Sequence, residues 1–143
     1  MENTINFTYS RAEKLKSKIL FEKLFSEGKN LTIYPLRLVY VKTELKDGVP
    51  IKVGVSVSKR KFKSAVKRNR IKRVLREAYR HNKSILFNNS IANYALLILY
   101  LGKELPDSND IDRQMITLLE KFSKKEGEQM INSTALENNL NDD

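Results

Sequence analysis

The apolar positions along the chain change their period several times, and each period indicates a helix or a strand. Residues 51–58 alternate strictly between apolar and polar side chains, which is typical of a strand with one buried face. Residues 93–102 are apolar on both faces and therefore predict a central strand. Two shorter apolar segments, 31–34 and 36–43, are interrupted by Pro35 and predict two further strands.

Three other segments place apolar residues at helical spacing. The first covers residues 18–27, with Ser17 as its N-cap and Gly28 at its end. The second begins near Ser64, and the third begins at Asp110, which could cap it. The apolar face of the second consists of Ile71, Val74, Leu75, Ala78 and Tyr79. The apolar stripe of the third consists of Ile111, Met115, Leu118, Leu119 and Phe122.

This order of elements predicts an α+β fold, with one sheet of about four strands packed with three helices. The second helix connects the two strands on either side of it, so those strands are expected to be parallel neighbours. We expect an irregular N-terminal arm over residues 1–16 and a single domain over 17–125. Residues 126–143 hold five acidic residues and no Lys or Arg, and predict a disordered, acidic tail.

Positive charge is concentrated on the second helix and on the residues before it. Residues 59–83 include 12 Lys and Arg side chains, and Glu77 is the only acidic residue among them. At about 100° per residue, most of the cationic side chains on the helix fall opposite its apolar face. Like charges at such spacing destabilise a helix, and a polyanionic partner such as RNA relieves the repulsion. The pattern therefore predicts a nucleic-acid-binding domain.

Three other interpretations of this helix stay open. A charged helix face is most often ordinary solvated surface, although such surfaces usually mix both signs. A membrane-surface helix is disfavoured because the apolar face is mainly aliphatic and has no Trp, which is typical of a protein core. A DNA-reading helix is disfavoured because the polar face holds almost only Lys and Arg, which suit phosphates rather than bases.

The remaining composition limits the chemistry of the chain. There is no cysteine, and therefore no disulfide and no thiolate metal site. His81, the single histidine, lies near the end of the basic helix, is expected to be solvated and has no carboxylate cluster near it in sequence. We therefore expect no catalytic residue and no metal site in this chain. Without a long apolar segment or a signal peptide, the sequence predicts a cytoplasmic protein that does not bind membranes.

Three segments around the basic helix carry a distinctive combination of residues. They are Val55-Ser56-Val57-Ser58-Lys59, Lys67-Arg68-Asn69-Arg70-Ile71-Lys72-Arg73 and Arg76-Glu77-Ala78-Tyr79-Arg80. This combination resembles the signature of the bacterial ribonuclease P protein component family, whose hallmark is Arg-Asn-Arg followed by further basic residues on one helix. Residues 21–28 are similar to the first helix of that family, and residues 36–41 are similar to its aliphatic strand with an internal tyrosine. The resemblance covers about residues 13–125.

The resemblance implies a small basic subunit of a ribonucleoprotein endoribonuclease. Its partners would be ribonuclease P RNA and precursor tRNA, whose 5′ leader the RNA removes with Mg²⁺ ions that the RNA itself holds. No organic cofactor and no obligate protein partner are implied. The family fold also implies a left-handed crossover of the basic helix between its two parallel strands, whereas such crossovers are right-handed as a rule.

We assign two groups of residues on this basis. The RNA-binding residues are Lys59, Arg60, Lys67, Arg68, Asn69, Arg70, Lys72, Arg73, Arg76 and Arg80. The residues of a leader groove between the first helix and the sheet are Phe21, Phe25 and Tyr40. The alternative for these aromatic residues is a place in the core. The alternative function is that of a ribosome-associated or RNA-chaperone protein, which binds structured RNA without a role in cleavage.

Overall fold

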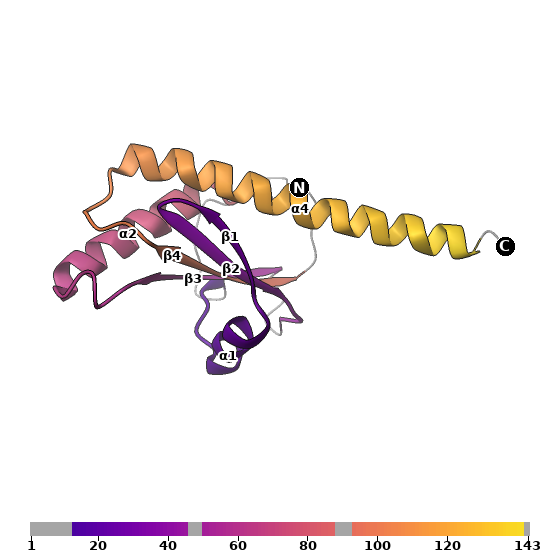
Figure 1. Ribbon diagram of the computed structural model, residues 1–143, viewed down its shortest axis with the longest axis horizontal. Coiled ribbons are helices and arrows are strands. Elements are labelled where there is room, and N and C mark those ends of the chain that lie inside the picture. The colour runs from indigo at the N-terminus through magenta and orange to yellow at the C-terminus, as the bar shows by residue number, and fades with distance from the viewer. Residues whose placement is uncertain (1–12, 46–49, 88–92, 142–143) are drawn as a thin grey trace, which may run out of the picture.

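The structure of the protein is a computed structural model that describes residues 13–45, 50–87 and 93–141. Most of the predicted N-terminal arm, residues 1–12, lies outside these ranges. Four helices and four strands lie within them (Figure 1). In chain order they are α1 (Lys18–Glu27), β1 (Lys29–Ile33), β2 (Leu36–Lys42), β3 (Ile51–Val57), α2 (Ala65–Asn82), α3 (Ser84–Phe87), β4 (Tyr94–Tyr100) and α4 (Ser108–Asn141).

The four strands form one mixed sheet in the order β1-β2-β4-β3. The pairs β1–β2 and β2–β4 are antiparallel, whereas β3 and β4 run parallel and are connected through α2. The predicted α+β class, the central position of β4 and the parallel neighbours are therefore confirmed. The left hand of the crossover stays a prediction that rests on the family resemblance.

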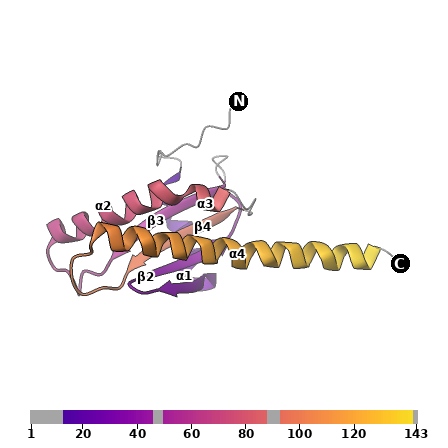
Figure 2. The ribbon, with the colours of Figure 1, turned by 90° about the horizontal axis from the view of Figure 1, so that it is seen from above.

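The sheet separates two groups of helices and two apolar cores. Helices α2 and α4 lie on one side of it, and α1 lies on the other (Figure 1). The larger cluster, which we call the main core, lies beneath α2 and α4 and includes all five apolar residues of the predicted α4 stripe. The smaller cluster, which we call the α1 core, includes Leu24 of α1 with Val39, Val41 and Leu97 of the sheet. Figure 2 shows α4 extending along the sheet and well beyond it.

Helix α1 begins and ends as its sequence predicts. The Ser17 hydroxyl accepts a hydrogen bond from the amide of Leu20 at 3.4 Å, which satisfies one donor of the first turn. At the other end, the amide of Gly28 donates to the Leu24 carbonyl at 2.9 Å. A Cβ atom on Gly28 would lie 2.2 Å from that oxygen and 2.7 Å from Val39, so glycine allows α1 to end directly against the sheet.

Helix α2 is held to the molecule by its apolar face. Ile71 and Leu75 are completely buried, and Ala78 and Tyr79 are nearly so, as predicted. At about 25 cal/mol per Å² of apolar surface, such burial offsets the repulsion among the cationic residues of the other face. The single-turn helix α3 follows directly; it was not predicted because four residues are too short to show a helical period.

The residues just before α1 belong to the folded domain, which corrects the predicted boundary at residue 16. Lys14 forms a parallel bridge with Val53, and the amide of Leu15 donates to the Val53 carbonyl at 3.0 Å. The Glu13 carboxylate accepts from the Lys83 ammonium at 2.7 Å, and both residues are buried. Removing one partner of a buried ion pair typically costs about 3–5 kcal/mol, so this pair secures the chain before α1 to the end of α2.

Helix α4 begins at a different cap from the predicted one. The Asp107 carboxylate accepts from the amides of Asn109 at 2.8 Å and Asp110 at 3.3 Å. Asp110 is therefore inside the first turn, where its negative charge interacts favourably with the positive end of the helix dipole. Either aspartate satisfies the sequence rule for a cap, and the path of the preceding loop decides between them.

Helix α4 also continues to Asn141, whereas we predicted a disordered tail from residue 126. Glu126 is 5% exposed and accepts a short hydrogen bond from the Tyr94 hydroxyl, so it belongs to the domain. Residues 127–141 contain no proline, and Gly127 costs a helix only about 1 kcal/mol. Because helical hydrogen bonds are local, the backbone can continue as a helix beyond Glu126.

Candidate RNA-binding surfaces

The outer face of α2 carries a cationic stripe, which we define as Asn69, Arg73, Arg76 and Arg80. At about 100° per residue these four side chains fall within roughly 60° of one another, opposite Ile71. Asn69, Arg73 and Arg76 are exposed, and Arg80 is half-buried. Lys72 borders the stripe on one side and Arg70 on the other. The helix therefore presents the guanidinium groups of Arg73 and Arg76, each able to bind a phosphate through two parallel hydrogen bonds.

The end of this stripe is organised by the single acidic residue of α2. The Glu77 carboxylate accepts from the Arg80 guanidinium at 2.9 and 3.2 Å, and His81 Nε2 lies 3.9 Å from it. The hydrogen bond from Arg80 holds the pKa of Glu77 below its usual value. Glu77 therefore keeps a negative charge that orients Arg80 and weakens its field, so we expect the RNA affinity of the stripe to come mainly from its earlier residues.

Arg68 has a different environment from the other arginines of α2. Its guanidinium donates to the Phe62 carbonyl at 2.7 Å and to the Lys63 carbonyl at 2.9 Å. It is half-buried and lies beside the start of the helix rather than on the stripe. Arg68 thus fastens the preceding loop to α2, a role that the basic pattern alone did not reveal. Both hydrogen bonds use Nη1, so the other N–H groups of the guanidinium are able to bind a phosphate.

The loop over residues 59–63 continues the positive surface beyond the start of α2. The Ser58 hydroxyl accepts from the amides of Arg60 at 3.2 Å and Lys61 at 3.3 Å, which folds the loop into a turn. Phe62 is buried against Tyr100, with the ring centroids 6.1 Å apart. Lys59 and Arg60 are exposed on this anchored loop, and Lys67 is exposed in the first turns of the helix.

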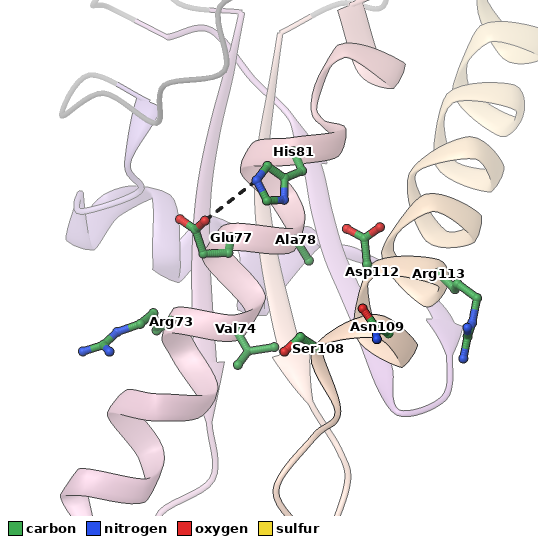
Figure 3. Close-up of a pocket in the computed structure, with 9 residues that line it drawn as sticks. All are labelled: Arg73, Val74, Glu77, Ala78, His81, Ser108, Asn109, Asp112 and Arg113. Carbon is green, nitrogen blue, oxygen red and sulfur yellow. Dashed lines mark ion pairs between the residues drawn. The ribbon is translucent and has the colours of Figure 1, made fainter.

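A groove of about 730 Å³ runs between α2 and the first turns of α4 (Figure 3). Val74 and Ala78 form its apolar part, and Ser108 and Asn109 face them from α4. Figure 3 shows that Arg73 points outward from α2, away from α4. The Asn82 amide donates to Asp112 at 2.8 Å and joins the two helices nearby. The groove thus adds hydroxyl and amide groups, which suit ribose, beside the cationic stripe.

The structure brings together only two of the three predicted leader-groove residues. Phe25 is 73% exposed on α1, and Phe21 lies one turn before it, half-buried against the α1 core. Tyr40 is 1% exposed and lies in the main core, on the opposite face of the sheet. Its ring packs on Phe122 at 4.8 Å and on Tyr94 at 6.2 Å. Its assignment to the groove is therefore corrected, and the core alternative holds for Tyr40.

The reason for this correction is the alternation of side chains along β2. Val39 and Val41 face α1, so Tyr40 between them must face α4. Burial raises the pKa of the Tyr40 hydroxyl to about 12, with the nearby Glu126 carboxylate as the second cause. Alternation along β2 predicts which side chains share a face of the sheet, but it does not predict which face α1 covers.

The register of the sheet reveals a row of mainly polar residues that the sequence pattern did not predict. Thr32, Arg37, Leu99 and Ser56 are paired in succession across β1, β2, β4 and β3, on the same face as the α1 core. Thr32 and Arg37 are exposed, Leu99 and Ser56 are half-buried, and the Arg37 Nε donates to the Thr32 hydroxyl at 3.3 Å. We call these four residues the open row. The signal available in the sequence was a lone arginine within the apolar segment 36–41.

Two other kinds of site are absent from the part of the chain that the structure describes. There, no three His, Cys, Asp or Glu side chains are grouped so that they could hold a metal ion. No helix among the described residues is long and apolar enough to cross a membrane. The two features that remain are the cationic stripe and, across the sheet, the aromatic side of α1 beside the open row. They are typical of a small, basic α+β protein of the nucleic-acid-binding class.

Comparison with known proteins identifies the family within that class. The model of the ribonuclease P family matches residues 9–123. The ribonuclease P protein component of Porphyromonas gingivalis is 38% identical over 119 residues, covering 80% of this chain and 86% of the relative. That of Chlorobium phaeobacteroides is 37% identical over 120 residues, covering 75% of this chain and 82% of the relative. The chain therefore belongs to the bacterial ribonuclease P protein component family, as its signature predicted.

Solved structures agree on the fold. The ribonuclease P protein of Staphylococcus aureus superposes with a TM-score of 0.61 and 22% identity, covering 76% of this chain and 94% of that one. The ribonuclease P protein from Thermotoga maritima superposes with a TM-score of 0.61 and 23% identity, covering 76% of this chain and 96% of that one. The chain is thus the protein component of a ribonucleoprotein endoribonuclease that processes tRNA, and its family implies a ribonuclease P RNA as partner.

Proposed function

We propose that the protein uses two separate surfaces to assist 5′ maturation of tRNA. The cationic stripe of α2 binds ribonuclease P RNA, and the α1 side of the sheet binds the single-stranded 5′ leader of precursor tRNA. The observation that carries this proposal is the placement of the two surfaces on opposite sides of one rigid sheet. A protein built in this way can contact the catalytic RNA and its substrate at the same time.

The stripe fits a structured RNA through its phosphates. Asn69, Arg73 and Arg76 project from a helix whose apolar face is fixed in the main core, so little backbone entropy is lost on binding. The Asn69 amide can bond both phosphate and ribose oxygens, and the groove beside Ser108 offers further contacts to ribose. Lys59, Arg60 and Lys67 extend the same surface toward the loop.

The α1 side of the sheet fits an unpaired strand. Phe25 presents an exposed ring on which a base can stack, and Phe21 lies beside it at the edge of the α1 core. The open row supplies one cation, Arg37, and two hydroxyl groups, from Thr32 and Ser56, for the phosphates and riboses of the strand. Aromatic stacking combined with a cationic track is the usual way in which proteins hold single-stranded RNA.

Chemistry in this proposal is performed by the RNA. The Mg²⁺ ions that the family implies are held by the catalytic RNA, and we derive no step from a metal ion on the protein because the described residues do not group as ligands. The protein increases the population of correctly bound precursor, which lowers the Mg²⁺ concentration that the reaction requires. A location in the cytoplasm, where tRNA precursors are made in bacteria, is part of the same proposal.

A reconstituted holoenzyme tests the proposal. Cleavage and binding would be measured at low Mg²⁺ with a precursor that has a long leader, with one that has a single-nucleotide leader, and with mature tRNA. We expect the wild-type protein to favour the long leader and Arg37→Ala to reduce that preference about tenfold, within the range for a charge-assisted hydrogen bond. Lys121→Ala, which removes an exposed cation from α4, is the matched control.

Two results would contradict the proposal. If the protein binds ribonuclease P RNA tightly but does not stimulate leader removal, the RNA-chaperone alternative describes it better. If stimulation is normal but Arg37→Ala and Lys121→Ala behave alike, the leader does not follow the open row.

A further inference from the structure

The groove between α2 and the first turns of α4 has a recess in its α2 wall. Val74, Ala78 and His81 follow one another along this wall, at the helical spacing that puts them on one face of α2. Because Ala78 has the smallest side chain of the three, the wall is recessed between Val74 and the imidazole ring of His81 (Figure 3). The step from Val74 to His81 spans about 10 Å of helix, which leaves room for one nucleobase along the wall.

The opposite wall of the groove offers hydrogen-bonding groups. Val74 points across the groove toward Ser108, and Asn109 is the next residue of α4 (Figure 3). Both polar residues are exposed. The Asp107 cap uses the backbone amide of Asn109, so the side-chain amide of Asn109 is able to bond a ligand. A hydroxyl and a carboxamide both donate and accept hydrogen bonds, which suits the 2′-hydroxyl group of a ribose.

The charged side chains of the lining balance one another, and most of them are paired within the protein. The Asp112 carboxylate accepts from the side-chain amide of the last residue of α2 at 2.8 Å, and the Glu77 carboxylate accepts from Arg80 at 2.9 Å. Arg113 is bonded to Asp110 and points away from the groove (Figure 3). The lining holds two carboxylates and two guanidinium groups, so their formal charges cancel. A neutral, flat ligand therefore suits the inside of the groove better than a phosphate does.

The groove opens directly beside the cationic stripe. Arg73 belongs both to the stripe and to the lining, and its guanidinium points away from α4 (Figure 3). A phosphate bound by Arg73 therefore lies at the edge of the groove, and the nucleotide attached to it can turn its base toward Val74. Unpaired bases are recognised by stacking on aromatic rings, including that of histidine. The side chain of His81 is 55% exposed and presents such a ring.

We infer that this groove binds the base and the ribose of one unpaired nucleotide of ribonuclease P RNA. The base lies over Ala78, between Val74 and the ring of His81, and the ribose contacts the α4 wall. The nucleotide belongs to the catalytic RNA because the groove and the stripe lie on the same side of the sheet, whereas the proposed leader surface lies on the other. The inference rests on the proposed binding of this RNA by the stripe, and it adds a contact that involves no charge.

Paired substitutions at His81 test the inference with the full-length chain and ribonuclease P RNA. His81→Ala removes the ring, whereas His81→Phe keeps one. Both variants lose the contact between His81 and Arg80 at 2.8 Å, so the difference between their affinities measures the contribution of the ring alone. We expect His81→Ala to weaken binding about tenfold, within the range for one stacked base, and His81→Phe to bind like the wild type.

The α4 wall permits a second test. Asn109→Ala should weaken binding of the same RNA about fivefold, within the range for a neutral hydrogen bond. Asn93→Ala, which removes an exposed amide at the far end of β4, is the matched control and should change nothing. Titrations over a range of salt concentrations separate this contact from the phosphate contacts. Asn109→Ala should leave the slope of log affinity against log salt unchanged, whereas Arg73→Ala should lower it by about 0.7–0.9.

Thermal unfolding checks that the variants fold, which we expect because His81 and Asn109 are exposed. Equal affinities of folded His81→Ala and His81→Phe would overturn the inference, and so would equal affinities of Asn109→Ala and Asn93→Ala. The proposed function fails separately, when Arg73→Ala binds ribonuclease P RNA as tightly as the wild type. A difference between the two His81 variants that appears only with precursor tRNA would overturn the assignment of the nucleotide to the catalytic RNA.

Discussion

Arg68 and Arg73 show how the same residue type serves two purposes on one helix. Arg73 lies on the cationic stripe and points outward from α2 (Figure 3). Arg68 lies at the flank and donates to the carbonyls of Phe62 and Lys63. Both belong to the basic signature of the family, yet only their surroundings show that one points outward and the other holds the loop.

This difference predicts different effects of alanine substitution. Arg73→Ala should weaken binding to ribonuclease P RNA by about 1–3 kcal/mol, the range for hydrogen bonds to charged groups, and should leave thermal stability unchanged. Arg68→Ala should weaken binding and also lower the free energy of unfolding by about 1–2 kcal/mol, because two carbonyl groups lose their donor. Filter binding and denaturant unfolding of both variants check this. Equal stability of the two variants would show that the Arg68 contacts contribute nothing to the fold.

The two phenylalanines of α1 permit a similar comparison. Phe25→Ala should reduce the preference for precursor over mature tRNA about tenfold, since one stacked base is worth about 1–3 kcal/mol. Its stability should not change, because the ring is 73% exposed. Phe21→Ala should reduce both the preference and the stability, because this ring also packs on the α1 core. A large drop in melting temperature for Phe25→Ala, with an unchanged preference, would exclude Phe25 from the leader site.

At the scale of elements, α2 combines two opposing forces. The Lys and Arg side chains of its outer face repel one another, whereas its apolar face is buried in the main core. The repulsion is therefore stored in the free protein and relieved when phosphates approach the stripe. The buried apolar face therefore holds in place a helix with a single acidic residue, and the proposed contact with phosphates would lower its internal repulsion.

The stripe should make RNA binding strongly dependent on salt. Each neutralised phosphate contributes a slope of about 0.7–0.9 to a plot of log affinity against log salt concentration. If Arg73 and Arg76 each contact one phosphate, replacing both with alanine should lower the slope by roughly 1.5. Titrations from low to physiological salt measure it. A slope near zero for the wild type would contradict an electrostatic role for α2.

Helix α4 has a part that packs on the domain and a part that extends past it. Phe122 is completely buried and Glu126 is bonded to Tyr94, so the packed part reaches at least residue 126. Deleting residues 127–143 should therefore leave the melting temperature and RNA binding intact, and affinity should rise slightly as four acidic residues leave. Deleting residues 122–143 is the contrasting variant and should unfold the protein, because it opens the main core around Tyr40. A shorter deletion that fails to fold would show that the extension is structural.

In the molecule as a whole, the sheet separates two groups of elements. Helix α2 and its cations lie on one side, whereas α1 and the open row lie on the other. The β3–α2–β4 connection places the cationic stripe and the sheet in one rigid unit. If two RNA elements bind on the two sides as proposed, the sheet keeps them at a constant separation, which is what a subunit that positions a substrate requires.

The protein without RNA should not cleave precursor tRNA. The described residues provide no group of metal ligands, and the Glu77 carboxylate is occupied by Arg80. Incubating purified, nuclease-treated protein with labelled precursor checks this, and adding back ribonuclease P RNA should restore cleavage. Undiminished cleavage after nuclease treatment would contradict the assignment of the chemistry to the RNA.

The sequence by itself determined the elements and the partner class. Caps, glycines and short-range periodicity depend on neighbours within a few residues, so α1, the four strands and the two faces of α2 could be predicted closely. The Arg68-Asn69-Arg70 signature likewise identified the family, because the spacing of charges on one helix is a local property.

Only the tertiary structure decided how distant segments meet. It placed Tyr40 beneath α4 rather than beside α1, and it aligned Thr32, Arg37, Ser56 and Leu99 from four strands into one row. It also extended the domain to Glu13 and Glu126, whose partners lie 70 and 32 residues away in the chain. These features depend on which sheet face a helix covers and on strand register. Both are set by packing between residues far apart in the sequence, which no local pattern records.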